Sequence, residues 1–217
     1  MFNFVFSKSF SQYLAMIHPD TELKWISNEV GYGIVAKSFL PKGTITWVQD
    51  ELDRVFTPME IVKLNNIYKE VLFKYCFRNN KGDYVLCWDI ARYTNHSFHS
   101  NCMTTAYDFE IAIRDIYPGE ELTDDYGYLN LPRPFRARPE GTRRKVVHAD
   151  DVVKYHKQWD KILKSCFRDI LVVNQALQGL ISNDLWAKIN RIATGIEEMD
   201  SIITCYYNES HNSLNYN

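Results

Sequence analysis

Residues 112–127 read AIRDIYPGEELTDDYG, and this stretch decides the fold. Its centre, Tyr117-Pro118-Gly119-Glu120, has the composition of a tight turn, because proline presets φ and glycine tolerates a positive φ. An apolar strand pair across 102–114 is predicted to end at this turn. On its own, PGEEL is a turn and the DYG at 125–127 is the end of a strand.

Two polar segments lie upstream. Arg92-Tyr93-Thr94-Asn95-His96-Ser97, followed by Asn101-Cys102, sets polar groups beside an apolar strand, where each buried group needs a hydrogen-bond partner. Gly31-Tyr32-Gly33 places two glycines at a strand start, where backbone can approach a ligand closely or adopt positive φ. Taken singly, each segment favours a structural interpretation: a turn or bulge for the glycines, and side chains satisfied by backbone for NHS.

In this order and spacing the segments resemble the SET domain, the fold of many protein lysine methyltransferases. GYGIVAKSFLPKG at 31–43 is similar to the opening GxG strand and turn of that family. RYTNHSFHSNC at 92–102 is similar to its R-F-x-N-H-S-x-x-x-N-C segment, with Tyr93 in the aromatic position. The resemblance covers about residues 22–128 and fades outside them.

The resemblance implies an α+β fold: a SET-domain β-clip of several small sheets, with a knot-like crossing of the NHS and DYG segments, followed by a helical C-terminal region. We expect an N-terminal extension at 1–21, the SET domain at 22–130, a connector at 131–149 and the helical region at 150–217.

Local patterns add detail to this layout. Strands are expected around 23–27, 31–39 and 44–48, with the last two in one small sheet around the turn Pro41-Lys42-Gly43. Thr57, Pro58 and Glu60 predict a capping box that opens one helix reaching Tyr75. A hairpin around 79–82 and helices after Ala149 and from about Ser182 complete the pattern, and the polar tail is expected to fray.

The resemblance also implies a site. S-adenosylmethionine would be the cofactor, and Tyr126 would stand beside the transferred methyl as the main catalytic residue. Tyr75, in the Tyr75-Cys76-Phe77 stretch, matches a family Y-x-F whose tyrosine lines the lysine channel. The implied cofactor-binding residues are Gly31, Tyr32, Gly33, Arg92, Asn95, His96 and Tyr126.

Two departures from the family pattern matter. Asp124 stands where many members have Phe or Tyr, a position linked with the number of methyls added, so the product state stays open. The cysteine-rich zinc tail is also missing: Cys102 is the one ligand left, Arg144 stands at the last cysteine place, and we expect no metal. The helical region, with Trp159, Phe167 and Trp186, is either a substitute closure for the channel or a plain helical cap.

Bulk composition narrows the setting. With a formal charge of −2, 46% apolar residues and five scattered cysteines, the chain is expected to be an intracellular, cytoplasmic protein with free thiols. Secretion into a host cell and action in a nucleus stay open. No membrane partner and no nucleic-acid partner is expected, although the basic stretch 133–145 keeps a chromatin-binding role as one alternative.

The expected partner is a protein substrate bearing a target lysine, such as a histone or another basic protein. A second alternative is a SET-like binding module without catalysis. The sequence indicates neither the substrate nor the oligomeric state.

Overall fold

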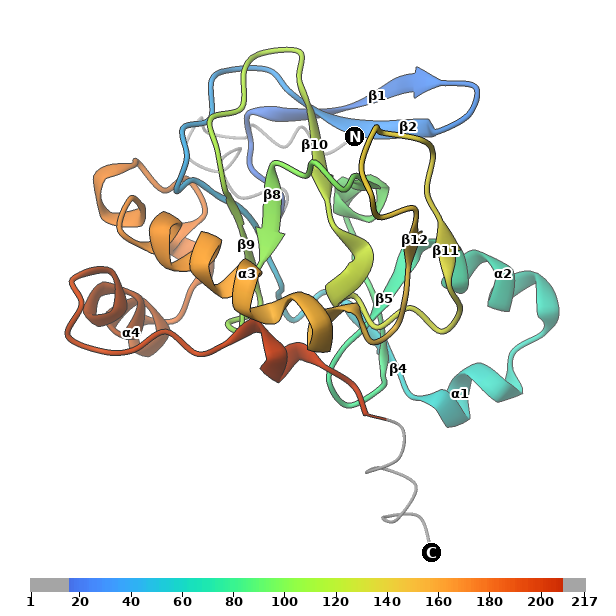
Figure 1. Ribbon diagram of the computed structural model, residues 1–217. Coiled ribbons are helices and arrows are strands. Elements are labelled where there is room, and N and C mark those ends of the chain that lie inside the picture. The colour runs from blue at the N-terminus through green and yellow to red at the C-terminus, as the bar shows by residue number, and fades with distance from the viewer. Residues whose placement is uncertain (1–15, 209–217) are drawn as a thin grey trace, which may run out of the picture.

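A computed structural model describes residues 16–208 (Figure 1). The first sheet has the order β1-β2-β10-β7 and contains β1 (Thr21–Ser27), β2 (Gly31–Ala36), β10 (Glu121–Asp124) and β7 (Asn95–His96). β1 and β10 each pair antiparallel with β2, whereas β10 and β7 run parallel. The sheet therefore joins the three motifs, which are far apart in sequence.

The other strands form three small sheets. β3 (Ile45–Val48), β9 (Phe109–Ala112) and β8 (Cys102–Thr104) make one, and β4 (Arg54–Phe56), β6 (Tyr84–Leu86) and β5 (Cys76–Arg78) make another. β11 (Phe135–Arg136) pairs with β12 (Val146–Val147). The expected strand pair across 102–114 and the hairpin around Asn79–Gly82 are confirmed as β8–β9 and β5–β6.

The expectation that 31–39 and 44–48 share a sheet is wrong. The link between β2 and β3 does not fold back as a hairpin but crosses to the strand β9. Leu40 forms a bridge with Ile116, and the Gly43 amide donates to the Ala112 carbonyl at 2.9 Å. Gly43 has φ +91°, and a Cβ there would lie 2.6 Å from Asp169 Cβ, so only glycine suits this crossover.

The helix predicted from Thr57 is two helices. The capping box of Thr57 and Glu60 is confirmed at the start of α1 (Pro58–Lys63). The chain then turns at extended Leu64, and the Asn65 side chain accepts from the Tyr68 amide to start α2 (Asn66–Tyr75). A second N-cap within the apolar pattern ended the first helix, and apolar spacing alone does not reveal such a break.

The predicted helical C-terminal region is confirmed as α3 (Asp151–Phe167) and α4 (Asn183–Ala193), the latter capped by Ser182. Five short 3₁₀ turns complete the described chain: η2 (Ile90–Tyr93), η3 (Tyr126–Tyr128), η4 (Ile170–Val172), η5 (Gln178–Leu180) and η6 (Ile202–Cys205). In the described part of the chain, no helix has the length and apolarity needed to cross a bilayer. The tail from 209 lies outside the described residues.

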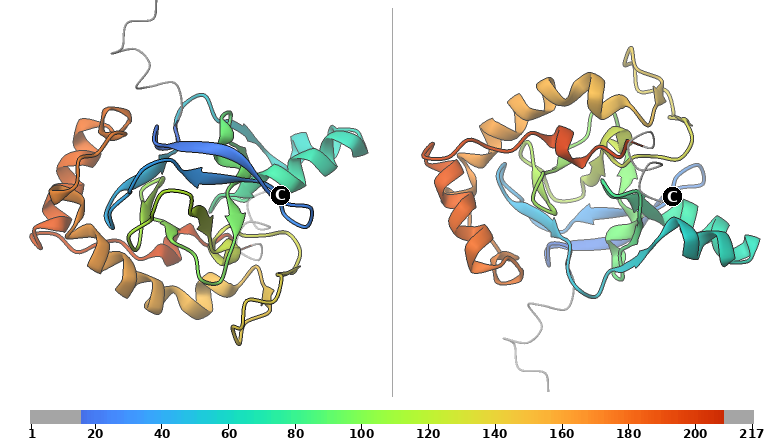
Figure 2. Two further views of the ribbon diagram at one scale, coloured as in Figure 1. Left: turned by 90° about the horizontal axis from the view of Figure 1, so that it is seen from above. Right: turned by 90° about the horizontal axis from the view of Figure 1, so that it is seen from below.

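Among the described residues, the two larger of three apolar clusters hold these layers together, and the third joins β4 and β6 to the helices α1 and α2. The larger core packs β3, β8 and β9 against α3 and α4, through residues such as Phe109, Leu163, Phe167 and Ile189. The smaller of these two cores lies under the first sheet. Figure 2 shows α3 and α4 on a different side of the sheets from α2, which projects outward. The site is thus built between α2 and the ends of β7 and β10, away from the helical core.

Candidate active site

The NHS and DYG segments are fastened to each other by the parallel pairing of β7 and β10. Asn95 pairs with Thr123 and His96 with Asp124. Asn101, 1% exposed, reinforces this contact: its amide donates to the Glu121 carbonyl at 2.8 Å, and its oxygen accepts from the Thr123 amide at 2.8 Å. The buried Asn therefore has the structural role that a polar residue beside a strand requires.

The backbone amide and the side-chain hydroxyl of Tyr126 are both hydrogen-bonded. Its amide donates to His96 Nδ1 at 3.2 Å, and its hydroxyl donates to the Thr94 carbonyl at 2.7 Å. Burial and nearby carboxylates raise the pKa of the Tyr126 hydroxyl, so it stays protonated at neutral pH. The hydroxyl proton is directed at Thr94, which leaves the oxygen lone pairs free to accept from another group.

His96 is a buried neutral imidazole with one ring nitrogen unused. Desolvation lowers the pKa of His96, and its Nδ1 accepts from Tyr126, so the ring hydrogen belongs on Nε2. Nε2 is buried and has no hydrogen-bond partner in the described chain. A buried donor without a partner is costly, which makes it a candidate contact for a ligand acceptor.

The GxG turn is locked to the NHS segment through Asn95. The Asn95 amide nitrogen donates to the Tyr32 carbonyl at 2.9 Å and to Glu121 Oε1 at 2.7 Å. Gly31 has φ +84°, and a Cβ on Gly33 would lie 2.3 Å from Glu121 Oε1 and 2.8 Å from Asn95 Nδ2. Gly33 is therefore required by this packing and Gly31 by its positive φ, and the side-chain oxygen of Asn95 is left free.

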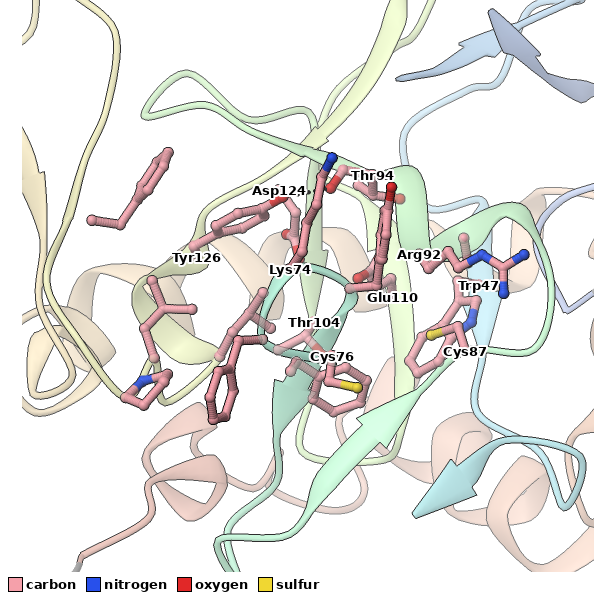
Figure 3. Close-up of a pocket in the computed structure, with 18 of the residues that line it drawn as sticks. Trp47, Lys74, Cys76, Cys87, Arg92, Thr94, Thr104, Glu110, Asp124 and Tyr126 are labelled. Atoms are coloured by element: carbon pink, nitrogen blue, oxygen red, sulfur yellow. Dashed lines mark hydrogen bonds between the residues drawn. The ribbon is translucent and has the colours of Figure 1, made fainter. Parts of the chain in front are cut away.

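A cavity of about 540 Å³ opens between α2, β5 and the end of β10 (Figure 3). Tyr126, Tyr75 and Arg92 all line it, so the two predicted catalytic residues share one cavity. The other implied cofactor residues, Gly31, Tyr32, Gly33, Asn95 and His96, are not among its lining residues. They lie next to the cavity, where the Asn95 side chain joins β7 to β2. The Tyr32 ring extends this contact by packing on the Tyr93 ring, with 6.2 Å between the ring centres.

Asp124 does face the cavity, together with a carboxyl that sequence reasoning missed. Glu110, on β9, lines the same cavity and shares a hydrogen bond between carboxyl groups with Asp124. The Tyr128 hydroxyl also donates to Asp124. Burial raises the pKa of Glu110 to about 7 and that of Asp124 well above its usual range. In the sequence, the one indication of a special role for Glu110 was its charge between the apolar residues Phe109 and Ile111.

The connector, not the helical region, borders the cavity. Leu131, Pro132, Arg133, Pro134 and Phe135 line it, and no residue of α3 or α4 does, so the suggestion that these helices close the channel is wrong. Trp159 and Phe167 are buried in the larger core, and Trp186 packs against it. Their apolar faces are used by that core.

Arg144, at the last cysteine place of the family tail, is the anchor of this connector. Its guanidinium pairs with Asp125 and, at 2.6 Å, with Asp151 on α3, and it lies 4.7 Å from the Phe98 ring centre. Glu140 also accepts from the Phe98 amide at 2.8 Å. Cys102 is fully buried, and across residues 16–208 no group of three or more His, Cys, Asp or Glu is arranged to hold a metal ion.

Comparison with protein-family models matches residues 31–127 to the SET domain. The matched span begins at the first glycine of the GxG turn and ends at the last residue of DYG. This chain therefore contains a SET domain, in the α+β form expected, with a helical region after it. SET domains are generally protein lysine methyltransferases. A comparison with curated proteins gave no match.

Proposed function

We propose that the protein is an S-adenosylmethionine-dependent protein lysine N-methyltransferase. The observation that carries the proposal is the shared cavity of Tyr126 and Tyr75, at the end of the strand that fastens the NHS and DYG motifs together. The acceptor would be a lysine of a protein, such as a histone or another basic protein.

The residues around β2 and β7 fit the cofactor. The unpartnered Nε2 of His96 can donate to a ring nitrogen or a carboxylate, and the free Asn95 oxygen can accept from an ammonium group. Phe135, 41% exposed and 5.6 Å from the His96 ring, offers a face for an adenine ring. When bound, S-adenosylmethionine supplies a methyl group on a positively charged sulfur.

The cavity residues suit the acceptor. Transfer requires a neutral amine held in line with the methyl, and a free lysine has a pKa of about 10.4. Burial disfavours the charged form of the amine. The Tyr126 oxygen, whose own proton is committed to Thr94, can accept from the amine and orient it. Tyr75 adds a ring wall that tolerates a cationic group.

The test is calorimetric titration of the full chain with S-adenosylmethionine and with its demethylated product. We expect micromolar binding that Asn95→Ala weakens by roughly 10-fold or more, because a donor, an acceptor and the GxG contact are lost together. Asn66→Ala, at an exposed position of α2, is the matched control and should bind like the unchanged chain. Transfer of labelled methyl to core histones is then measured.

Each result has a meaning. Binding with methyl transfer supports the enzyme. Binding without transfer to any lysine protein favours the alternative of a SET-like binding module. Absence of binding by the folded chain contradicts the proposal.

A further inference from the structure

The inner wall of the cavity differs in chemistry from its mouth. Exposed Phe73, Lys74 and Arg133 stand at the mouth, whereas buried Trp47, Cys87 and Asp124 form the inner wall. Figure 3 shows Asp124 beside Tyr126, with Glu110 on the other side of the Lys74 side chain in this view. Of the residues that line the cavity, these two are the ones with carboxyl groups.

The two carboxyls are close enough to share a proton. They are hydrogen-bonded to each other, and the Tyr128 hydroxyl occupies Asp124 from the other side. Two neighbouring carboxyls shielded from water cannot both ionise readily, so the pair shares one proton and carries a single negative charge. In residues 16–208, no lysine or arginine is a cause of the shifted pKa of Glu110.

A buried anion without a cation is costly, and the cavity gives a cationic ligand access to it. The aromatic side chains of Trp47, Phe77 and Tyr75 line the same space, and the Lys74 ammonium already lies over the Tyr75 ring, 5.1 Å from its centre, which shows that an ammonium group is tolerated beside these rings. The carboxyls disfavour an anionic group at this inner wall, whereas the basic residues stand elsewhere on the lining, and two carboxyls alone do not make a metal site. The chemistry of the inner wall thus favours an organic cation.

We propose that Glu110 and Asp124 form a binding site for the alkylammonium group of the acceptor at the inner end of the cavity. This inference rests on the proposed methyltransferase function and specifies its acceptor: the lysine enters charged, is recognised by a carboxyl pair, and loses a proton before the neutral amine accepts the methyl. Asp124 thereby has a role that Phe or Tyr at the same position could not fill.

The groups around Glu110 set how binding depends on pH. Tyr126 is neutral at pH 8, as are the buried Cys87 and Cys102 thiols, because burial raises the pKa values of all three groups. Burial also raises the pKa of Asp124 well above its usual range. The basic residues that also line the cavity are Lys74, Arg92 and Arg133. Binding of an ammonium should therefore weaken as the pH falls through about 7, where Glu110 takes up a proton.

The experiment uses n-butylammonium, which has the length and charge of a lysine side chain, and the neutral 1-butanol. Both are titrated calorimetrically into the full chain at pH 8 and pH 5.5, with and without the demethylated cofactor. At pH 8 we expect at least tenfold tighter binding of n-butylammonium, a preference that Glu110→Gln and Asp124→Asn each reduce at least tenfold. Glu70→Gln, an exposed carboxyl change on α2, should leave it intact.

Equal binding of the two ligands by the unchanged chain, or an unchanged preference in folded Glu110→Gln, would overturn the proposal. Circular dichroism establishes that each variant is folded. Failure of the methyltransferase proposal has its own readout, since cofactor titration of the same samples does not involve butylammonium. Binding of n-butylammonium that depends on Glu110, without binding of the cofactor, would support the cation site and contradict the methyltransferase proposal.

Discussion

The Tyr126 hydroxyl donates its hydrogen to the backbone carbonyl of Thr94, 2.7 Å away. Thr94 directly precedes the NHS motif and Tyr126 belongs to DYG, so this bond joins the two motifs at the cavity wall. The His96 and Phe135 rings, 5.2 and 5.9 Å from the Tyr126 ring, restrict it further. The tyrosine oxygen is thus held in position before any substrate arrives.

Tyr126→Phe removes this oxygen and keeps the ring. We expect turnover to fall roughly 100-fold, because the amine loses the group that orients it. Cofactor affinity should be nearly unchanged, since the amide bond to His96 and the ring packing persist. Methyl transfer to core histones and calorimetry measure the two quantities. Tyr117→Phe, 60% exposed, is the control, and unchanged turnover in Tyr126→Phe would contradict the assignment.

Arg144→Gln should destabilise the protein by roughly 3 kcal/mol, because it leaves two buried carboxylates without their cation. The side chains of Asp125 and Asp151 are 6% and 2% exposed, so water cannot replace the guanidinium there. Urea unfolding of the variant and of the exposed neighbour Arg143→Gln gives the comparison. Equal stability of the two variants would show that Arg144 does not anchor the connector.

The sequence predicts the parts of this protein that depend on local rules. Thr57 and Glu60 predict the start of a helix, and Asn79–Gly82 predicts a hairpin, because capping and turn residues determine the structure of only a few neighbouring positions. The rest of the fold is predicted from the resemblance to the SET family. This resemblance implies the contact of the NHS and DYG segments, which lie far apart in the chain and which no periodicity could bring together.

What the sequence does not predict arises from long-range contacts. Glu110 lines the cavity because β9 places it near Asp124. A single charged residue in a strand does not reveal from the sequence which residue it will contact. Arg144 looks like one more residue of a basic, solvated stretch, yet it pairs with carboxylates on two other elements. Both roles depend on partners that only tertiary structure identifies.

Gly33→Ala should abolish cofactor binding more than it affects folding. The new methyl would lie 2.3 Å from Glu121 Oε1 and 2.8 Å from Asn95 Nδ2, so the hydrogen bond between these two side chains must break. Asn95 would then no longer align the GxG turn with the NHS segment. Calorimetry should show at least roughly 10-fold weaker binding, whereas Asn66→Ala, an exposed change on α2, should bind normally. Normal binding by Gly33→Ala would mean that the turn tolerates movement.

Glu110→Gln should stabilise the protein above neutral pH. Burial raises the pKa of Glu110 to about 7 from its usual 4.5, so the folded chain retains a proton that the unfolded chain releases between these values. Stability of the unchanged protein therefore falls as the pH rises from about 4.5 to about 7, and then levels.

Glutamine has no such titration, so the variant should gain roughly 1–3 kcal/mol over the unchanged chain at pH 8 and almost nothing at pH 4.5. Thermal unfolding at the two pH values measures the difference, with Glu70→Gln as the exposed control. Equal melting temperatures at pH 8 would mean that ionisation of Glu110 does not destabilise the folded protein. The argument that an unpaired carboxylate in the cavity favours binding of a cation would then be contradicted. A gain at pH 8 alone would identify Glu110 as a residue retained at the expense of stability, which is expected of a group kept for binding.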